Sequence, residues 1–266
     1  MLRPSEGDEA CGEPNLVIIT HGWWEKHAWP ADMALAIAAR TDPQQWRCGW
    51  YDWRREAHCM RPWEAAKIAR GVAGPHLGRE ILRLSRQYRH VHLIGHSAGS
   101  WVINEAANLI ARETDAEIHL TFLDAYVPDF WDQRDLGRPA GPLSQRLWGE
   151  QYFTRDFLLH FSDTVLTHAH NVDLTKVSPW PWFDRHLFLK DSHRFPIFWY
   201  RATVTGRYEH SWRLGGRTLW CRADGIEYGF ARSLESGAPQ WAGSCTLPAG
   251  AATVPIRPTR PSPEPR

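Results

Sequence analysis

A serine set between glycines, in Gly95-His96-Ser97-Ala98-Gly99, is the residue pattern with the most chemical content in this chain. An apolar run, 90–94, leads into the pattern, and residues with helical spacing, 97–112, follow it. A serine in a tight strand-to-helix turn projects its hydroxyl above a sheet, and the flanking glycines let neighbouring backbone come close. The dipole of a helix starting at Ser97 would also favour an anion there. We therefore predict that Ser97 is a nucleophile and not only a helix cap.

Acyl transfer at such a serine needs hydrogen-bond donors for the oxyanion that develops in the transition state. The main-chain N–H of Ala98, directly after the nucleophile, is the first donor that we expect. The second should come from the loop after an early strand. Thr20-His21-Gly22-Trp23 leaves the first apolar strand at the right place, which favours the N–H of Trp23. For His21 itself we expect a structural role.

The general base should be a histidine downstream of Ser97, because sites of this kind run in the chain order serine, acid, histidine. The histidines downstream include His119, His160, His168, His170, His186, His193 and His210. His193 is favoured because it follows a loop and precedes an apolar helical segment, 195–204. From such a loop its ring can reach over the nucleophile. His186, in the same loop, is the nearest alternative.

The acid that orients this histidine should follow a later strand of the sheet. Asp124 directly ends the apolar run 118–123, whereas Asp156 follows the next strand candidate, 151–154. We favour Asp124 and keep Asp156 as the competitor; either carboxylate could instead cap a turn. We expect no metal and no organic cofactor, because serine, histidine and backbone amides supply both proton transfer and charge stabilisation.

Strand and helix patterns alternate along the chain, which predicts an α/β fold with a mostly parallel sheet and helices on both faces. The predicted strands are 16–20, 45–53, 90–94, 117–123, 151–154 and 171–175. The predicted helices are 31–40, 63–88 with an irregularity at Gly74-Pro75, 97–112 and 195–204. We expect an N-terminal extension (1–14), one catalytic domain (15–247) and a disordered Pro-rich tail (248–266).

The composition excludes several classes of partner. Lys plus Arg number 31 and Asp plus Glu 30, and the basic residues are scattered, so we expect no nucleic acid partner. No segment has the length and apolarity of a membrane span, and the acidic start of the chain does not resemble a secretory signal. Bridges Cys48–Cys59 and Cys221–Cys245 are conceivable, but the odd count of 5 cysteines favours a reducing, cytoplasmic setting.

Four segments resemble the lipases of the α/β-hydrolase superfamily, especially the pancreatic-type triglyceride lipase group. In order they are Val17-Ile18-Ile19-Thr20-His21-Gly22-Trp23, Trp50-Tyr51-Asp52-Trp53-Arg54, Val91-His92-Leu93-Ile94-Gly95-His96-Ser97-Ala98-Gly99 and Leu123-Asp124-Ala125. The resemblance implies an α/β-hydrolase fold, Asp124 as the acid, and His193 ahead of the paired aromatics Trp199-Tyr200. It also implies an ester or lipid substrate of small-molecule size.

The chain departs from that group at several points. Ala98 and Ala125 stand where the group has Leu and Pro, and the group's large C-terminal β-domain does not fit in 266 residues. Segments 126–149 and 177–190 are the candidate lids. Carboxylic-ester hydrolysis is therefore the prediction, and a thioesterase or amidase would use the same residues. A non-catalytic relative of this fold, or a carbohydrate-binding protein that uses some of the 16 tryptophans, is the alternative of another class.

Overall fold

The computed structural model describes residues 2–4, 14–84, 88–128, 131, 136–137, 146–155, 165–176, 189–205, 207–209, 220–222, 229–230 and 244–246. For residues 2–4, 189–192, 207–209, 220–222 and 244–246 it describes the backbone alone. The alternative acid Asp156, the alternative base His186 and the predicted tail 248–266 lie outside these ranges, as do most of the two candidate lids.

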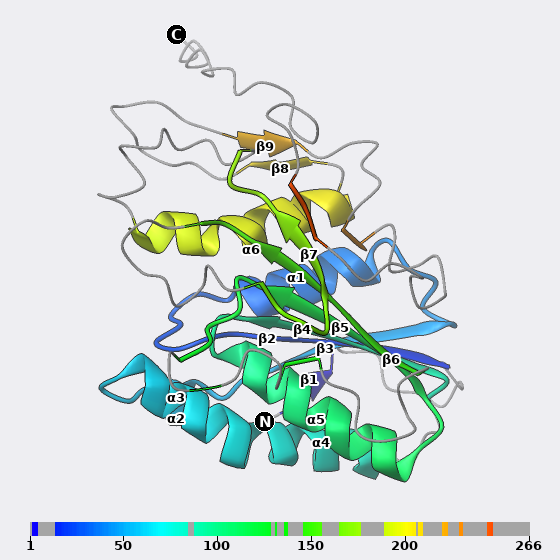
Figure 1. Cartoon of the computed structure of the whole chain (residues 1–266). Coiled ribbons are helices and arrows are strands. Elements are labelled where there is room, and N and C mark those ends of the chain that lie inside the picture. Colours follow the sequence, from blue (N-terminus) through cyan, green and yellow to red (C-terminus); the bar gives the residue numbers. More distant parts are fainter. Residues whose placement is uncertain are drawn as a thin grey trace, which may run out of the picture.

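An eight-stranded sheet forms the centre of the described part of the chain (Figure 1). From edge to edge its strands are β1 (Leu2–Pro4), β3 (Trp46–Tyr51), β2 (Asn15–Thr20), β4 (His90–His96), β5 (Glu117–Leu123), β6 (Leu147–Phe153), β7 (His170–Asp173) and β10 (Ser244–Thr246). Only β1 runs antiparallel to its neighbour, and every other pairing is parallel. A two-stranded sheet, β8 (Arg207–Glu209) with β9 (Trp220–Arg222), lies apart from it.

Helices cover both faces of this sheet (Figure 1). One face carries α1 (Trp29–Ala38) and α6 (Leu189–Thr205). The helices of the other side are α2 (Arg54–Ala57), α3 (Pro62–Ile68), the π-helical turn η1 (Ala69–Ala73), α4 (Gly74–Arg83) and α5 (Gly99–Glu113). The strand order, the antiparallel edge strand and the serine turn after the central strand β4 are those of the α/β-hydrolase fold. The predicted fold class is therefore confirmed.

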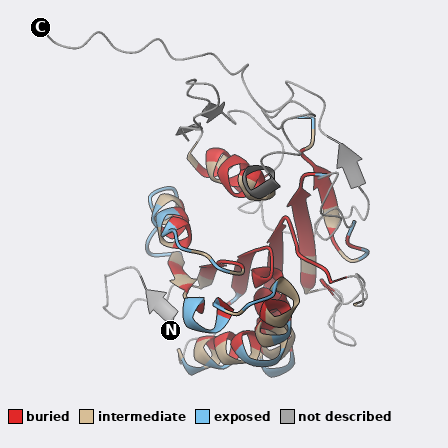
Figure 2. Cartoon of the chain, turned by 90° about the vertical axis from the view of Figure 1, so that its left-hand side faces the viewer, coloured by how far each residue is buried: buried red, intermediate tan, exposed pale blue. Residues whose placement is uncertain are grey.

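The central strands are buried on both sides, as the red ribbons of Figure 2 show. Two apolar cores result, one under α3 to α5 and the other under α1 and α6. Parallel strands that are covered on both faces read as continuous apolar runs, which is why 16–20 and 117–123 could be recognised from sequence.

Some details differ from the sequence-based expectations. The long helix expected at 63–88 is divided into α3, η1 and α4, because Pro75 occupies the first turn of a new helix that starts at Gly74. Residues 2–4, expected in an extension, add the edge strand β1. The Cys48–Cys59 bridge is wrong: the two cysteines are not joined in a disulfide, and Cys48 is buried on β3 while Cys59 is half-buried in a loop. The domain boundaries stay a prediction.

No described helix combines the length and the apolar character required to cross a bilayer.

Candidate active site

Ser97 lies in the sharp turn between β4 and α5. Its φ of 54° falls in the left-handed region, which costs a non-glycine residue about 1–3 kcal/mol. Its N–H donates to the Leu123 carbonyl at 3.0 Å, which ties the turn to the end of β5. The sequence placed Ser97 in the first turn of the helix, but α5 begins at Gly99, because the left-handed backbone of Ser97 cannot belong to a right-handed helix.

Two glycines allow the loop after β2 to pass close to this turn. A Cβ on Gly22 would lie 2.8 Å from the Cβ of Ser97 and 2.9 Å from the His96 carbonyl oxygen. A Cβ on Gly99 would collide with the carbonyl oxygen of His21. The two glycines therefore bring the Trp23 segment next to the nucleophile, where only backbone without a side chain fits.

Asp124 and His193 meet directly. The Nδ1 atom of His193 lies 2.6 Å from Oδ2 of Asp124, and because a carboxylate accepts, Nδ1 carries the proton and donates. The other carboxylate oxygen, Oδ1, accepts from the main-chain N–H of Thr154 at 2.9 Å. Asp124 is fully buried, whereas the side chain of His193 is 28% exposed. Because Nδ1 carries the proton, Nε2 is the unprotonated nitrogen of the neutral His193 ring.

The three predicted residues therefore lie in one region. Ser97 follows the carboxyl end of β4, Asp124 follows that of β5, and His193 lies in the N-terminal part of α6. Asp124 follows the residue that accepts from the Ser97 N–H. His193 contacts His96, the residue before Ser97, with ring centroids 4.6 Å apart. One expectation needs correction: His193 lies inside α6 and not in the loop before it. The helix starts at Leu189 and runs through Pro196, whereas the predicted helix started at 195.

The two predicted oxyanion donors flank the serine turn. Ala98 is the cap residue before α5, and Trp23 follows Gly22. Neither main-chain N–H donates to an acceptor among the described residues. The indole of Trp23 donates to the Cys59 carbonyl at 2.9 Å, which fixes this residue from its side-chain end.

His21 has structural contacts, as expected. Its ring stacks on Trp53 with an interplanar angle of 11°, and its Nε2 accepts from the Trp53 N–H at 3.2 Å. The indole of Trp53 in turn donates to the His21 carbonyl at 2.8 Å. These bonds hold the backbone between β2 and Trp23 in place.

Two contributors escaped the sequence reasoning. Thr154 supplies a main-chain donor to Asp124, and its only signal is that it follows β6, the neighbour of β5. His96 is buried against His193. Side chains alternate along the strand 90–96, which places His96 on the same face of the sheet as His92 and Ile94. The sequence therefore indicates the face on which His96 lies but not the residue that it contacts.

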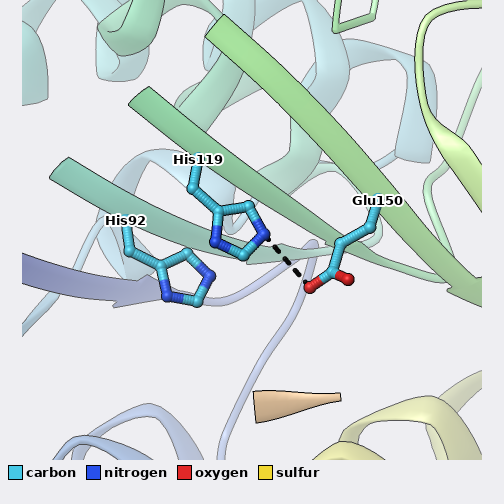
Figure 3. A group of neighbouring side chains, drawn as sticks. All are labelled: His92, His119 and Glu150. Carbon is cyan, nitrogen blue, oxygen red and sulfur yellow. Dashed lines mark hydrogen bonds and ion pairs between the residues drawn. The ribbon is translucent and has the colours of Figure 1, made fainter. Parts of the chain in front are cut away.

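A second group of polar side chains, His92, His119 and Glu150, lies inside the sheet on the α6 side (Figure 3). Potential ligand atoms of the three lie within 4.8 Å of one another. The two imidazoles, however, stack in parallel, with centroids 3.9 Å apart and planes at 7°, so they cannot both direct a lone pair at one ion without turning. Neither Nδ1 has a partner among the described residues, although a ligating histidine normally anchors its other nitrogen.

The remaining polar atoms of this group form hydrogen bonds with one another and with their neighbours. Thr121 Oγ1 lies 2.8 Å from His92 Nε2 and donates to Glu150 Oε1 at 2.9 Å. The same Oε1 lies 3.1 Å from His119 Nε2, and the Tyr152 hydroxyl donates to Oε2 at 2.7 Å. The geometry fits a hydrogen-bonded network inside the sheet better than a metal centre.

A cavity of about 480 Å³ opens at the other end of the sheet, lined by residues that include Tyr88, Ile110 and Ala116. These residues precede β4 and β5 or end α5. The cavity therefore lies at the amino ends of the strands, away from Ser97, and takes no part in the site.

This chain shows little similarity to known proteins. No family model matches the sequence, and no curated protein matches it. Among solved structures, a lid-less α/β serine hydrolase from Xanthomonas campestris, XC6422, is 17% identical, with 74% of this chain and 86% of that chain covered and a TM-score of 0.38. YbtT, a type II thioesterase from the yersiniabactin biosynthetic pathway, is 12% identical over 74% and 99%, with a TM-score of 0.36. The fold assignment rests on the strand order, and the site on its own geometry.

Proposed function

We propose that this protein is a serine hydrolase that cleaves carboxylic esters through a covalent acyl-enzyme. Ser97 Oγ attacks the ester carbonyl while Nε2 of His193 takes the hydroxyl proton. The alkoxide leaves with that proton, and a water molecule, activated by the same nitrogen, then releases the acid and restores Ser97. Asp124 holds the tautomer of His193 and stabilises its cationic form.

The observation that carries this proposal is the 2.6 Å bond between His193 Nδ1 and a fully buried Asp124 carboxylate, beside a serine with left-handed φ. Asp124 and His193 are 69 residues apart in sequence, and the strained turn has a cost that a mere helix cap would not require. The N–H groups of Trp23 and Ala98, which donate to no acceptor in the part of the chain that the structure describes, supply the oxyanion donors in this proposal.

Within the ester hydrolases, the resemblance of the four segments to pancreatic-type lipases favours an acyl ester of small-molecule or lipid size. Aromatic side chains of the loop after β2 agree with an apolar acyl group: Trp23, directly after Gly22, is half-buried, and Trp24, with φ 51°, is 48% exposed. A thioester would be attacked in the same way, so the substrate screen includes both esters and thioesters.

The test is intact-mass labelling of the full chain with a fluorophosphonate. The reagent reacts when Ser97 Oγ bonds to phosphorus, fluoride leaves and the proton passes to His193. We expect one adduct on wild type and none on Ser97→Ala of equal folded content. An adduct that persists in Ser97→Ala, or no adduct on folded wild type, would contradict the proposal. After a positive result, p-nitrophenyl esters and acyl thioesters of increasing chain length define the substrate.

A further inference from the structure

His96 is buried next to His193 and contacts its main chain. The Nε2 atom of His96 lies 3.0 Å from the His193 carbonyl oxygen. A carbonyl only accepts, so His96 is the Nε2–H tautomer and donates. The rings approach within 4.6 Å at 46°, and the Trp29 ring meets the His96 ring edge-on at 6.0 Å. His96 thus links the nucleophile turn to the backbone of the histidine that binds Asp124.

The turn of α6 that contains His193 needs an anchor of this kind. Pro196 lies inside the helix, has no N–H to donate to the carbonyl four residues earlier, and pushes that carbonyl aside. Pro196 therefore removes one helical hydrogen bond, to the carbonyl of the residue before His193. A second link comes from the next residue: Arg194 lies 3.9 Å from Glu25, whose other carboxylate oxygen accepts from the Trp29 indole at 2.9 Å.

We propose that His96 is a positioning residue, whose N–H fixes the His193 backbone so that the imidazole keeps its bond to Asp124 beside Ser97. This inference rests on the proposed function, since it assigns His96 a part in the same reaction. His96 touches neither substrate nor the reacting atoms in this assignment; it acts through His193.

The neutral state of His96 suits this position. Burial lowers the pKa of His96 well below its usual range, and the neighbouring His193, Arg194 and His21 lower it further, while its bond to the His193 carbonyl opposes the shift. Its Nδ1 has no partner among the described residues, so a second proton there would be unsatisfied. A neutral ring donates to the carbonyl without repelling the imidazolium that His193 becomes during turnover.

The experiment compares two substitutions at each of two buried histidines of β4. His96→Phe keeps a ring and removes the N–H, whereas His96→Gln keeps a donor of similar reach. His92→Phe and His92→Gln are the matched controls, because His92 bonds Thr121 and not His193. Fluorophosphonate labelling of folded protein should slow about 10- to 100-fold in His96→Phe, recover largely in His96→Gln, and stay close to wild type in both His92 variants.

A second measurement does not depend on activity. The Nδ1 proton of His193 in its short bond to Asp124 should give a low-field proton NMR signal that Asp124→Asn abolishes. We expect this signal to vanish or broaden in His96→Phe and to persist in His96→Gln and in folded His92 variants.

The outcomes separate the two proposals. Wild type that is not labelled, together with an NMR signal that still depends on His96, would remove the proposed function and keep the positioning role. Labelling and signal unchanged in His96→Phe would overturn the positioning role. Equal loss in His96→Gln and His96→Phe would also overturn it, because packing of the ring, and not its N–H, would then be responsible.

Discussion

At the scale of single residues, the Asp124 carboxylate is the part of the candidate site that sequence left most open. If it orients His193, Asp124→Asn should reduce fluorophosphonate labelling and ester turnover by about 10³- to 10⁴-fold, because an amide at this position favours the wrong tautomer of the ring. Asp156→Asn should change little. The comparison uses initial labelling rates at equal folded content, and a reversed pair of results would transfer the acid's role to Asp156.

The backbone of the turn makes a second prediction about residues. Gly99→Ala places a methyl group against the His21 carbonyl oxygen, so it should destabilise the protein by about 1–3 kcal/mol and slow labelling. The matched control is Gly71→Ala, where a Cβ would have nothing within 4 Å. Within η1 that change should stabilise by about 0.5–1 kcal/mol. Urea unfolding midpoints check both, and equal effects of the two substitutions would contradict the close approach.

At the scale of elements, the polar network across β4, β5 and β6 should hold these strands in register. Glu150 accepts from Thr121 and Tyr152 and lies within hydrogen-bond distance of His119. Glu150→Ala leaves those donors unsatisfied, at a cost of about 1–3 kcal/mol for each. Glu117→Ala is the control, because that side chain of β5 is 57% exposed. Urea unfolding should show a large loss for Glu150→Ala and a small one for Glu117→Ala. Similar losses would argue against the network.

The elements also show how far sequence reasoning reached. Strands 16–20 and 117–123 were readable because burial on both faces leaves a continuous apolar run, and the serine turn follows from its glycines and its place between strand and helix. Ser97, Asp124 and His193 could therefore be proposed from sequence, and their catalytic roles stay a prediction. The His96 contact was not readable, since it depends on how α6 crosses the end of β4, and that crossing is set by tertiary packing across 97 residues. The α6 start was missed because Pro196 resembles a helix beginning.

At the scale of the whole molecule, buried histidines on β4 and β5 should govern the response of the protein to pH. Burial lowers the pKa of His90, His92, His96 and His119 below the usual value of 6.5. Such groups bind protons more readily in the unfolded chain than in the folded one. Their contribution to stability is therefore complete above about pH 6.5 and is lost as pH falls below it.

The free energy of unfolding should accordingly decrease between pH 7.5 and pH 5.5, by up to about 1.4 kcal/mol per pH unit for each such histidine. Asp52 contributes little in this window. The pKa of Asp52 is held far below its usual range by the neighbouring His21 and Arg54, so its carboxylate stays ionised throughout. Urea unfolding curves recorded at pH values about 0.5 unit apart measure the slope of the unfolding free energy against pH, because such steps are narrower than the titration of a single group. His90→Gln, at the start of β4, should reduce this slope by at most the amount that corresponds to one proton taken up on unfolding. A slope near zero in wild type would mean that the folded sheet admits protons as easily as the unfolded chain, and the buried network would then have to carry charge.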